Sequence, residues 1–460
     1  MNQSTTPPQA RQFSSRTPLA AVGVKLRQLD LFGPVRERVR IAQKTVKDTP
    51  VDKLYDGFIA ILAGVRGMGE INKRLRSDPV LQNAFGRARC AEQSVVQDTL
   101  DACTAANVEQ MEQAMDMIYR QRSQGYQHDY RAQWQVLDVD MTGMPCGKKA
   151  ALAQKGYFAN QYNRRGRQLG RVLATRYGEV VVDRLFGGRT QLTTAFQPLV
   201  QAAERTLELD APKRARTILR VDGGGGSLDD VNWALERGYQ FHGKDYSVAR
   251  AHLLAQSVET WVDDPLVPER QVGWVTLEPT GYVRPIRRIA VRCRKKNGQW
   301  GIGVLLSTLS AVHVLVLTGQ SPDQAGEDTA VLLAYVHYYD QRGGGIETAT
   351  REDKQGLGLT KRNKKRFEAQ QILSQLAALA HNVIVWARRW LASHEPKIAA
   401  LGILRMVRDV FTLSGYVVRN GRGQIEQIVL NHVDPLASRL APALRELLNP
   451  EHVSVISGEI

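Results

Sequence analysis

The sequence contains few cysteines, and none of them forms a metal-binding pattern. Only four occur in 460 residues: Cys90, Cys103, Cys146 and Cys293. None belongs to a C-x-x-C pair, which argues against a zinc site built from cysteines. Nothing in their number or spacing requires disulfides, so we expect a protein of a reducing, cytoplasmic environment.

Long apolar runs are also absent. No stretch of about 20 apolar residues occurs, so we expect no span across a membrane. The N-terminal sequence "MNQSTTPPQARQFSSRTP" is polar, rich in Pro, Ser and Thr, and has no apolar signal core. This composition predicts a flexible tail over residues 1–30.

Two nucleotide-binding motifs are missing around the main glycine run, "RVDGGGGSLDD". A P-loop needs Lys followed by Ser or Thr after its glycines, but Ser227 and Leu228 stand there. A dinucleotide fingerprint needs glycine at the position of Leu228. Phosphate binding at the start of the following helix remains physically possible, but it is not specific.

The sequence has an excess of positive charge. Lys and Arg number 62 against 46 Asp and Glu, which gives a formal net charge of +16. With 43% hydrophobic residues, the chain is expected to be globular. The basic excess favours a polyanionic partner, usually nucleic acid. A basic but otherwise ordinary enzyme is the alternative.

Hydrophobic periodicity divides the chain into helical and β-rich parts. From about residue 35 to 123 apolar residues recur at helical spacing, which fits either a helix-turn-helix or plain helical packing. Between 133 and 250, strand patterns such as "QWQVLDVDMTG" and "TILRVD" alternate with helices. Residues 251–329 are β-rich, with a hairpin turn predicted at Asn297 and Gly298.

Three carboxylates lie at points where the predicted secondary structure changes. Asp140 lies near the end of the first predicted strand, Asp222 ends a later strand, and Glu347 begins a helix. Strand ends at one edge of a sheet bring such acids together, and clustered carboxylates can hold Mg²⁺. The glycines after Asp222 would let a substrate or metal approach closely. Each acid alone also fits a cap or turn role.

The surroundings of these acids leave choices open. Asp138 precedes Asp140 by two residues and would point to the same face of the strand, so it is an alternative metal ligand. Arg351 and Lys354 follow Glu347 by four and seven residues and would share its helix face, where they could meet phosphates. The same spacing also fits an exposed face with a Glu–Arg pair.

The succession "LDVDMT", "ILRVDGGGG…LERGYQFHGK" and "YDQRGGGIETATREDKQGL" resembles the DDE transposases of bacterial insertion sequences, in particular the transposase DDE domain group 1 type. The similarity covers roughly residues 35–430. It implies that Asp140, Asp222 and Glu347 are the catalytic and metal-binding residues of a two-metal enzyme. Mg²⁺ would be the cofactor, and we expect Mn²⁺ to substitute for it.

The last motif of the family, Y-x-x-R followed by E-x6-K, implies further residues near the acids. It maps onto Tyr339, Arg342, Glu347 and Lys354, and the tyrosine and the two cations would contact DNA. The Glu-to-Lys spacing is kept, but four residues rather than three separate Arg342 from Glu347. The glycines at 343–345 lie in this interval and would weaken a continuous helix.

The resemblance also implies an α/β fold with a ribonuclease-H-like core, which is a mixed five-stranded sheet flanked by helices. A β-rich insertion and an N-terminal all-α DNA-binding region would complete it. The expected divisions are a flexible tail (1–30), a helical DNA-binding region (31–125), the first part of the catalytic domain (126–250), the insertion (251–329), the second part of the catalytic domain (330–395) and a C-terminal region (396–460).

Two further groups of residues are candidates for contact with DNA. Trp300 follows the predicted hairpin turn among cations, and related transposases can stack a flipped base on such an aromatic. Packing across the strands is the alternative, and Trp274 and Tyr282 compete for the role. Lys361 and Arg362 belong to the basic run "TKRNKKR", which would follow the DNA backbone or form a solvated linker.

The function implied by the resemblance is DNA transposition. The protein would bind the terminal inverted repeats of an insertion sequence, then cleave and transfer DNA strands. Double-stranded DNA, as repeat and as target, would be its partner, and we expect a homodimer in the DNA complex, at the nucleoid of a bacterial cytoplasm. A catalytically silent DNA-binding protein derived from a transposase is one alternative. A ribonuclease-H-like nuclease without strand transfer is the other.

Overall fold

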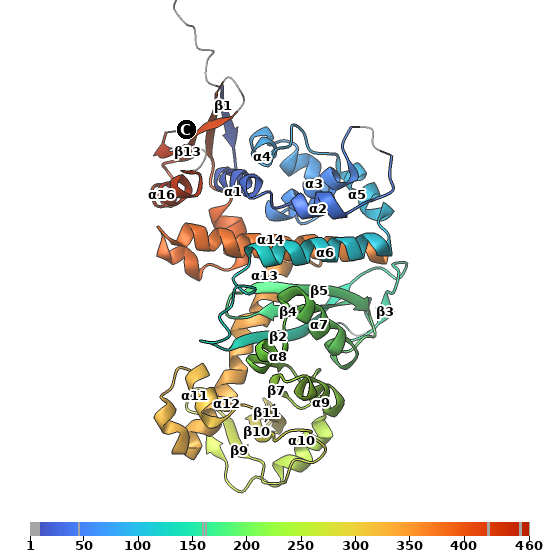
Figure 1. The fold of residues 1–460 in the computed structure, drawn as a ribbon, viewed down its shortest axis with the longest axis vertical. Helices are drawn as coiled ribbons and strands as arrows, with labels where there is room; N and C mark the ends of the chain where they lie inside the picture. The colour runs from blue at the N-terminus through green and yellow to red at the C-terminus, as the bar shows by residue number, and fades with distance from the viewer. Residues whose placement is uncertain are drawn as a thin grey trace, which may run out of the picture. The chain divides into compact units, whose positions relative to one another are not determined.

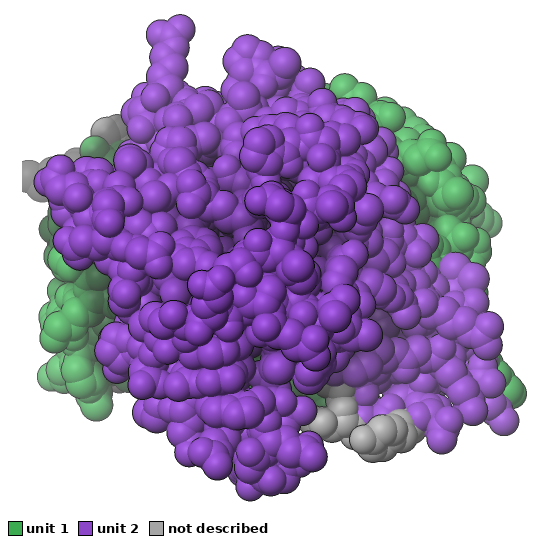
Figure 2. All heavy atoms as spheres, turned by 90° about the horizontal axis from the view of Figure 1, so that it is seen from below, with its two compact units in different colours: residues 1–123, 149–151, 349–460 green, residues 124–148, 152–348 purple. Residues whose placement is uncertain are grey.

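The structure is a computed structural model that describes residues 10–44, 47–158, 161, 163–420, 424–449 and 453–459. The chain forms two compact units, which Figure 2 colours separately. Unit 1 consists of residues 1–123, 149–151 and 349–460, and unit 2 consists of residues 124–148 and 152–348. Unit 1 therefore combines both ends of the chain. The chain re-enters unit 1 at residue 349, two residues after Glu347.

Unit 2 is built on a ten-stranded mixed sheet (Figure 1). The strands are β2 (Gln135–Pro145), β3 (Gln154–Lys155), β4 (Arg165–Ala174), β5 (Glu179–Gly187), β6 (Thr217–Val221), β7 (Gln240–Lys244), β8 (Val262–Asp263), β9 (Arg270–Trp274), β10 (Arg287–Arg294) and β11 (Trp300–Ser307). Their order is β3-β4-β2-β6-β7-β11-β10-β9-β8, and β5 pairs with β4.

The strand β2 lies where the sheet changes from antiparallel to parallel pairing. It runs antiparallel to β4 and parallel to β6, and β6 runs parallel to β7. The group β5-β4-β2-β6-β7 is therefore mixed. The β-rich segment 251–329 continues the same sheet, because β11 pairs antiparallel with β7. Its hairpin turns at Asn297 and Gly298 as predicted, and Gly298 takes the positive φ of 80° that such a turn favours.

Helices cover both faces of this sheet. They are α7 (Leu192–Leu207), α8 (Ala211–Ala215), α9 (Leu228–Glu236), α10 (Val248–Ala255), α11 (Ala311–Leu317) and α12 (Asp328–Arg342). On one face, Leu199 of α7 fills the space beside Gly170 of β4. On the other, Arg220 of β6 donates to the carbonyl of Tyr338 in α12. Gly170 pairs with Met141 of β2, and Arg220 pairs with Asp138 of β2. Because Asp138 and Met141 are three positions apart on one strand, these two pairs lie on opposite faces of the sheet. The expectation of a mixed α/β fold is confirmed.

Unit 1 combines helices from both ends of the chain with a small sheet. Its helices include α1 (Thr17–Gln28), α2 (Gly33–Arg38), α3 (Pro50–Leu62), α4 (Pro79–Ala84), α5 (Gln93–Ala102), α6 (Ala105–Arg122), α14 (Phe367–Ala392) and α16 (Ala437–Leu447). The long helix α14 is buried along most of its length and packs against α3, α5, α6 and α16. Within the described ranges, no helix combines the length and apolar character needed to cross a membrane.

The prediction of a flexible tail over residues 1–30 is wrong for the part that the structure describes. Residues Ala10–Ser14 form β1, which pairs antiparallel with β12 (Gly415–Arg419). The apolar stretch "PLAAVGVKL" then forms α1, whose residues are mostly buried against α4 and α16. Apolar spacing after the polar start therefore decides the local structure. The strand β1 also means that the N-terminal region is not entirely helical.

The sheet of unit 1 has four strands in the order β1-β12-β13-β14. The strands β12 and β13 (Ile425–Asn431) are antiparallel, while β14 (Ser454–Gly458) runs parallel to β13. The connection between β12 and β13 begins at Asn420 and continues with Gly421 in the sequence. Its glycine lies outside the described residues.

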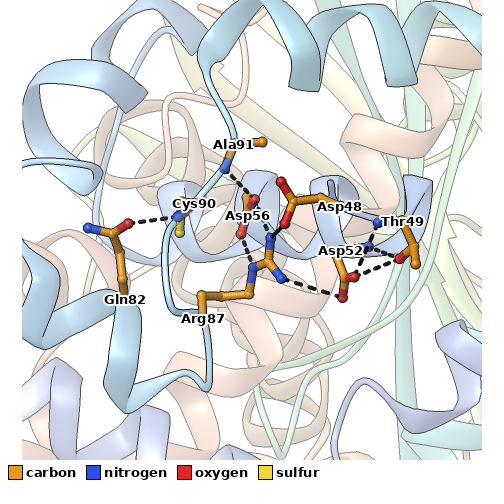
Figure 3. Close-up of polar contacts among 8 residues, drawn as sticks. All are labelled: Asp48, Thr49, Asp52, Asp56, Gln82, Arg87, Cys90 and Ala91. Atoms are coloured by element: carbon orange, nitrogen blue, oxygen red, sulfur yellow. Dashed lines mark hydrogen bonds and ion pairs between the residues drawn. The ribbon is translucent and has the colours of Figure 1, made fainter. Parts of the chain in front are cut away.

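A polar cluster fixes the N-terminal helices of unit 1 (Figure 3). Arg87 donates Nη2 to Asp48 at 2.6 Å and Nε to the fully buried Asp56 at 2.8 Å, and it lies 3.7 Å from Asp52. Asp56 also accepts the backbone N–H of Ala91 at 2.7 Å. Because a buried carboxylate needs a partner, Arg87 ties the loop after α4 to α3.

Candidate active site

The structure brings the three predicted acids together at one edge of the sheet in unit 2. Val139 of β2 pairs with Val221 of β6, and the next residue on each parallel strand is an acid, Asp140 and Asp222. Both strands are formed by alternating or continuous apolar sequence, so the pairing itself places the acids next to each other. Glu347 ends a short π-helical turn that follows α12.

Arg342, at the end of α12, lies between two of these acids. Its Nη2 is 3.5 Å from Asp140 Oδ2, and its Nη1 is 3.5 Å from Glu347 Oε1. Nη2 also approaches the carbonyl of Val139 at 3.4 Å. The side chain of Arg342 is 2% exposed, whereas that of Glu347 is 59% exposed. The guanidinium thus forms a buried positive centre on which the acids converge.

The extra residue between Arg342 and Glu347 is accommodated by the π-helical turn Gly343–Glu347. The turn is kinked at Gly345, whose φ of −89° and ψ of −110° are not helical, and Glu347 still comes within 3.5 Å of Arg342 although four residues intervene. Gly345 is essential for this approach. A side chain there would place its first carbon 2.9 Å from Asp138 Oδ2 and from Thr175 Cγ2. The expectation that these glycines weaken a continuous helix agrees with the kink at Gly345.

The electrostatics of the site reflect burial and crowding of like charges. Burial raises the pKa of Asp140 to about 7; Arg342 opposes the rise, while Asp222 and Glu347 add to it. Burial also raises the pKa of Tyr339 to about 12. Tyr339 is half-buried next to Arg342, as the family motif implies. Perturbation of this kind is typical of functional sites.

Asp138 is not an alternative ligand in this structure. It is fully buried, and both its oxygens accept from Arg220, Oδ1 from Nε at 2.6 Å and Oδ2 from Nη2 at 2.9 Å. Oδ2 also accepts the hydroxyl of Thr175 at 2.7 Å. With its bonding capacity used inside the protein, Asp138 acts as a structural partner of Arg220. Of the two acids of β2, Asp140 is the one that lies beside Arg342 at 3.5 Å.

The glycines after Asp222 serve the packing of the chain itself more than access for a ligand. A side chain on Gly226 would collide with the backbone of Lys244, at 2.0 Å from its carbonyl oxygen. One on Gly225 would meet Leu192 at 2.9 Å. Asp222 accepts the backbone N–H of Gly224 at 2.8 Å, which closes a tight turn. The expectation that these glycines admit substrate or metal is corrected for these two positions.

The site has the donor chemistry of a magnesium centre but not its arrangement. Carboxylate oxygens are the ligands that Mg²⁺ prefers. Yet among the residues described, no three His, Cys, Asp or Glu side chains are grouped closely enough to hold a metal ion. A guanidinium lies between Asp140 and Glu347 instead. In this arrangement the residues do not fit a metal.

The cations predicted at positions 351–362 all belong to unit 1. Arg351 and Lys361 are exposed, and Lys354 is half-buried on α13 (Thr348–Gly356). Arg362 is only 4% exposed, and its Nη1 donates to the carbonyl of Val65 at 2.8 Å. The expectation that Arg362 contacts DNA is therefore corrected, because its charge is buried and bonded within the unit.

Trp300 is packed among arginines. The guanidinium carbon of Arg292 lies 4.7 Å from its ring centroid and 4.0 Å from that of Trp261. Arg294, the cross-strand partner of Trp300, lies 5.9 Å away. These cation–π contacts match the packing alternative. A stacked DNA base on Trp300 stays a prediction.

A cavity of about 530 Å³ next to the site was not foreseen from the sequence. Its lining includes Tyr339 and a set of basic side chains over an apolar floor. The basic residues are Lys244, His252, Arg270, Arg294 and Lys295. Lys244 is the most informative, because its side chain also passes the glycine turn after Asp222. It ends β7, the parallel neighbour of β6, so the strand-end rule applied to Asp222 could have found it.

Comparison with known proteins adds little to this geometry. No family model matches the chain, and no curated protein matches it. Among solved structures, it is similar to a chain of a piggyBac transposase synaptic complex with hairpin DNA. The sequence identity is 12%, the TM-score is 0.44, and the match covers 96% of this chain and 84% of that chain. At this level the likeness assigns no role to any residue.

Proposed function

We propose that this chain is a DDE-type DNA transposase, which binds the terminal inverted repeats of an insertion sequence and cleaves and transfers DNA strands. The observation that carries the proposal is that buried Arg342 lies 3.5 Å from both Asp140 and Glu347, while Asp222 neighbours Asp140 on the paired strand. The three acids come from separate elements and follow the order of the family motifs, with one residue more than the usual spacing between Arg342 and Glu347. Structural ion pairs alone would not require three crowded carboxylates.

The sheet of unit 2 supports a ribonuclease-H-like core. The strands β5-β4-β2-β6-β7 form a mixed five-stranded group, and α7 and α12 lie on opposite faces. Asp140 and Asp222 directly follow Val139 and Val221, the last pair between the parallel strands β2 and β6. Open α/β sheets bind their ligands at this end of their parallel strands. The strands of 251–329 would then be an insertion that widens this sheet.

The proposed chemistry is phosphoryl transfer. Two Mg²⁺ ions, replaceable by Mn²⁺, would supply the activated oxygen nucleophile and the stabilisation of the leaving oxygen. Asp140, Asp222 and Glu347 would have to draw together to hold them, because no three such side chains among the described residues are grouped for a metal ion as they stand. Lys244, whose side chain passes the glycine turn after Asp222, would bind a phosphate there, and Tyr339 would line the path of the strand. Lys354, Arg351 and Lys361 would bind DNA from unit 1.

The proposed partner is double-stranded DNA, as terminal repeat and as target. The net charge of +16 supports a polyanionic partner. A homodimer in the DNA complex and a place at the bacterial nucleoid belong to the same proposal.

The direct test is Mg²⁺-dependent cleavage of DNA that carries the ends of the flanking element. Wild type should cut at the end, and Asp222→Ala should bind the end but not cut it. The matched control is Asp229→Ala, because Asp229 is an exposed acid on α9 near the same turn and should cut like wild type. Cutting by Asp222→Ala would contradict the assignment.

The same assay separates the alternatives. End binding by the wild type without cutting at any divalent cation would favour a catalytically silent DNA-binding protein. Cutting without joining to a target duplex would favour a nuclease without strand transfer.

A further inference from the structure

The two arginines beside the acids are bonded in different ways. Arg220 donates two short hydrogen bonds to the carboxylate of Asp138, at 2.6 and 2.9 Å, and its Nη1 donates to the carbonyl of Tyr338 at 2.8 Å. Arg342 makes three long approaches, at 3.4 to 3.5 Å, to Asp140, Glu347 and Val139. Its Nε is buried without a hydrogen-bond partner. Arg220 is committed to one carboxylate, whereas Arg342 is shared loosely between two.

A buried guanidinium with incomplete hydrogen bonds is costly, so something must compensate for it. Charge provides the compensation. Asp140 and Glu347 lie within ion-pair distance of Arg342, and Asp222 also acts on its charge. Without this cation, three carboxylates would face one another at one edge of the sheet. Arg342 therefore stands where a cation is needed.

We propose that Arg342 is an internal counter-cation, which neutralises Asp140 and Glu347 in the metal-free protein and competes with a divalent cation for Glu347. The inference rests on the proposed function, because it takes the acids as ligands of that cation. It also accounts for the absence of a metal-ready group among the described residues. Arg342 is thus a positioning residue and not an exposed phosphate contact.

Glu347 is the partner that can exchange. The side chain of Glu347 is 59% exposed, and Glu347 is the last residue of the turn Gly343–Glu347. The turn begins with Gly343 and Gly344, which have open space around them: a side-chain carbon added to either would have no neighbour within 4 Å. Asp140, in contrast, is held within β2 and accepts the backbone N–H of Met141 at 2.7 Å. Release of Glu347 from Arg342 would let the acids gather without moving the sheet.

The test is Mn²⁺ binding to the full chain without DNA, measured by titration calorimetry and by the shift in melting temperature. Arg342→Gln should melt below wild type without metal, but should bind Mn²⁺ about tenfold more tightly, because a competing charge is removed. Arg270→Gln is the matched control. Arg270 is also a largely buried arginine shared between two carboxylates, Asp264 and Asp340. It should lose stability with its Mn²⁺ affinity unchanged.

Equal or weaker Mn²⁺ binding by Arg342→Gln would overturn the inference and leave the proposed function standing. Absence of Mn²⁺ binding by the wild type would overturn the metal-dependent function as well. If Arg342→Gln does not fold, structures of the wild type with and without Mn²⁺ decide. The Arg342–Glu347 separation should exceed about 4 Å when the ion is bound. An unchanged pair beside a bound ion would overturn the inference.

Discussion

Asp138 and Asp140 point to the same face of β2, yet their surroundings differ in charge. Asp138 is matched by Arg220, which bonds to both of its oxygens. Asp140 shares the loosely held Arg342 with Glu347 and also lies near Asp222. We therefore expect Asp138 to contribute to stability and Asp140 to function, since active sites commonly keep destabilising charge.

Replacing Asp138 by Ala should lower the free energy of unfolding by about 3–5 kcal/mol, because Arg220 would remain charged and buried without its partner. Replacing Asp140 by Ala should change it little or raise it, because a carboxylate crowded by two others is removed. Urea unfolding of both variants at neutral pH, without metal, makes the comparison. Equal losses in the two variants would contradict this division of roles.

His242 should make the protein sensitive to acid. Burial, together with the charge of Arg220, lowers the pKa of His242 to about 3. Because the folded pKa lies below the unfolded value of about 6.5, the unfolded state takes up the proton first, and stability is lost as the pH falls below about 6.5.

The measurement is urea unfolding of wild type and His242→Gln at neutral pH and near pH 5. Between these values the wild type should lose about 2 kcal/mol more than the variant. The loss belongs to acid pH alone, so the two proteins should respond alike between neutral and mildly alkaline pH. Parallel pH profiles throughout would contradict a buried, neutral His242.

At the scale of the element, the π turn Gly343–Glu347 determines where Glu347 lies. The turn departs from helical geometry at Gly345, with φ −89° and ψ −110°, and this residue passes close to β2. The other two glycines have open space around them. One short element thus contains one position that requires glycine and two that do not.

Gly345→Ala should lower the free energy of unfolding by about 1–3 kcal/mol and reduce strand cleavage, since the added carbon would displace Asp138 or Thr175. Gly343→Ala is the matched control and should be neutral or stabilising by up to about 1 kcal/mol, because alanine favours a helix. Thermal unfolding and the cleavage assay would be run on both variants. If Gly345→Ala is tolerated as well as Gly343→Ala, the close approach of Gly345 to Asp138 and Thr175 is refuted.

At the scale of the whole molecule, the chain leaves unit 1 after residue 123 and returns to it for good at residue 349. Helix α14, from the second half of the sequence, packs against α3, α5 and α6 from the first. Stability should therefore follow the units rather than the order of the sequence.

Hydrogen exchange should reveal this grouping. Leu376→Ala in α14 removes a fully buried side chain and should cost about 2–5 kcal/mol. It should speed exchange in α3 as well as in α14, with little effect on β2 and β6. The reciprocal control is Leu219→Ala in β6, also fully buried, which should affect unit 2 alone. Equal acceleration in both units by either variant would show a single cooperative unit.

The sequence by itself determined the features that depend on local chemistry. Alternation in "QVLDVDMTG" predicted β2, and the Asn–Gly pair predicted the turn of the β10–β11 hairpin. Asp222 follows the end of β6 as expected, whereas β2 continues past Asp140 to Pro145. Each of these signals is a side-chain period or a turn preference, and both act over a few residues. The strand-end rule then sufficed to expect Asp140 and Asp222 at one edge.

Only the tertiary structure decided which charged residue pairs with which. Arg220 and Asp138 are 82 residues apart, and Arg342 lies 203 residues beyond the Val139 carbonyl that it approaches. Gly226 is explained by the backbone of Lys244, Gly225 by the side chain of Leu192, and β1 by its pairing with β12. Contacts between distant segments leave no periodic trace in the sequence, because each partner alone is compatible with several environments. The guanidinium between the acids could therefore be recognised only once the fold had brought its partners together.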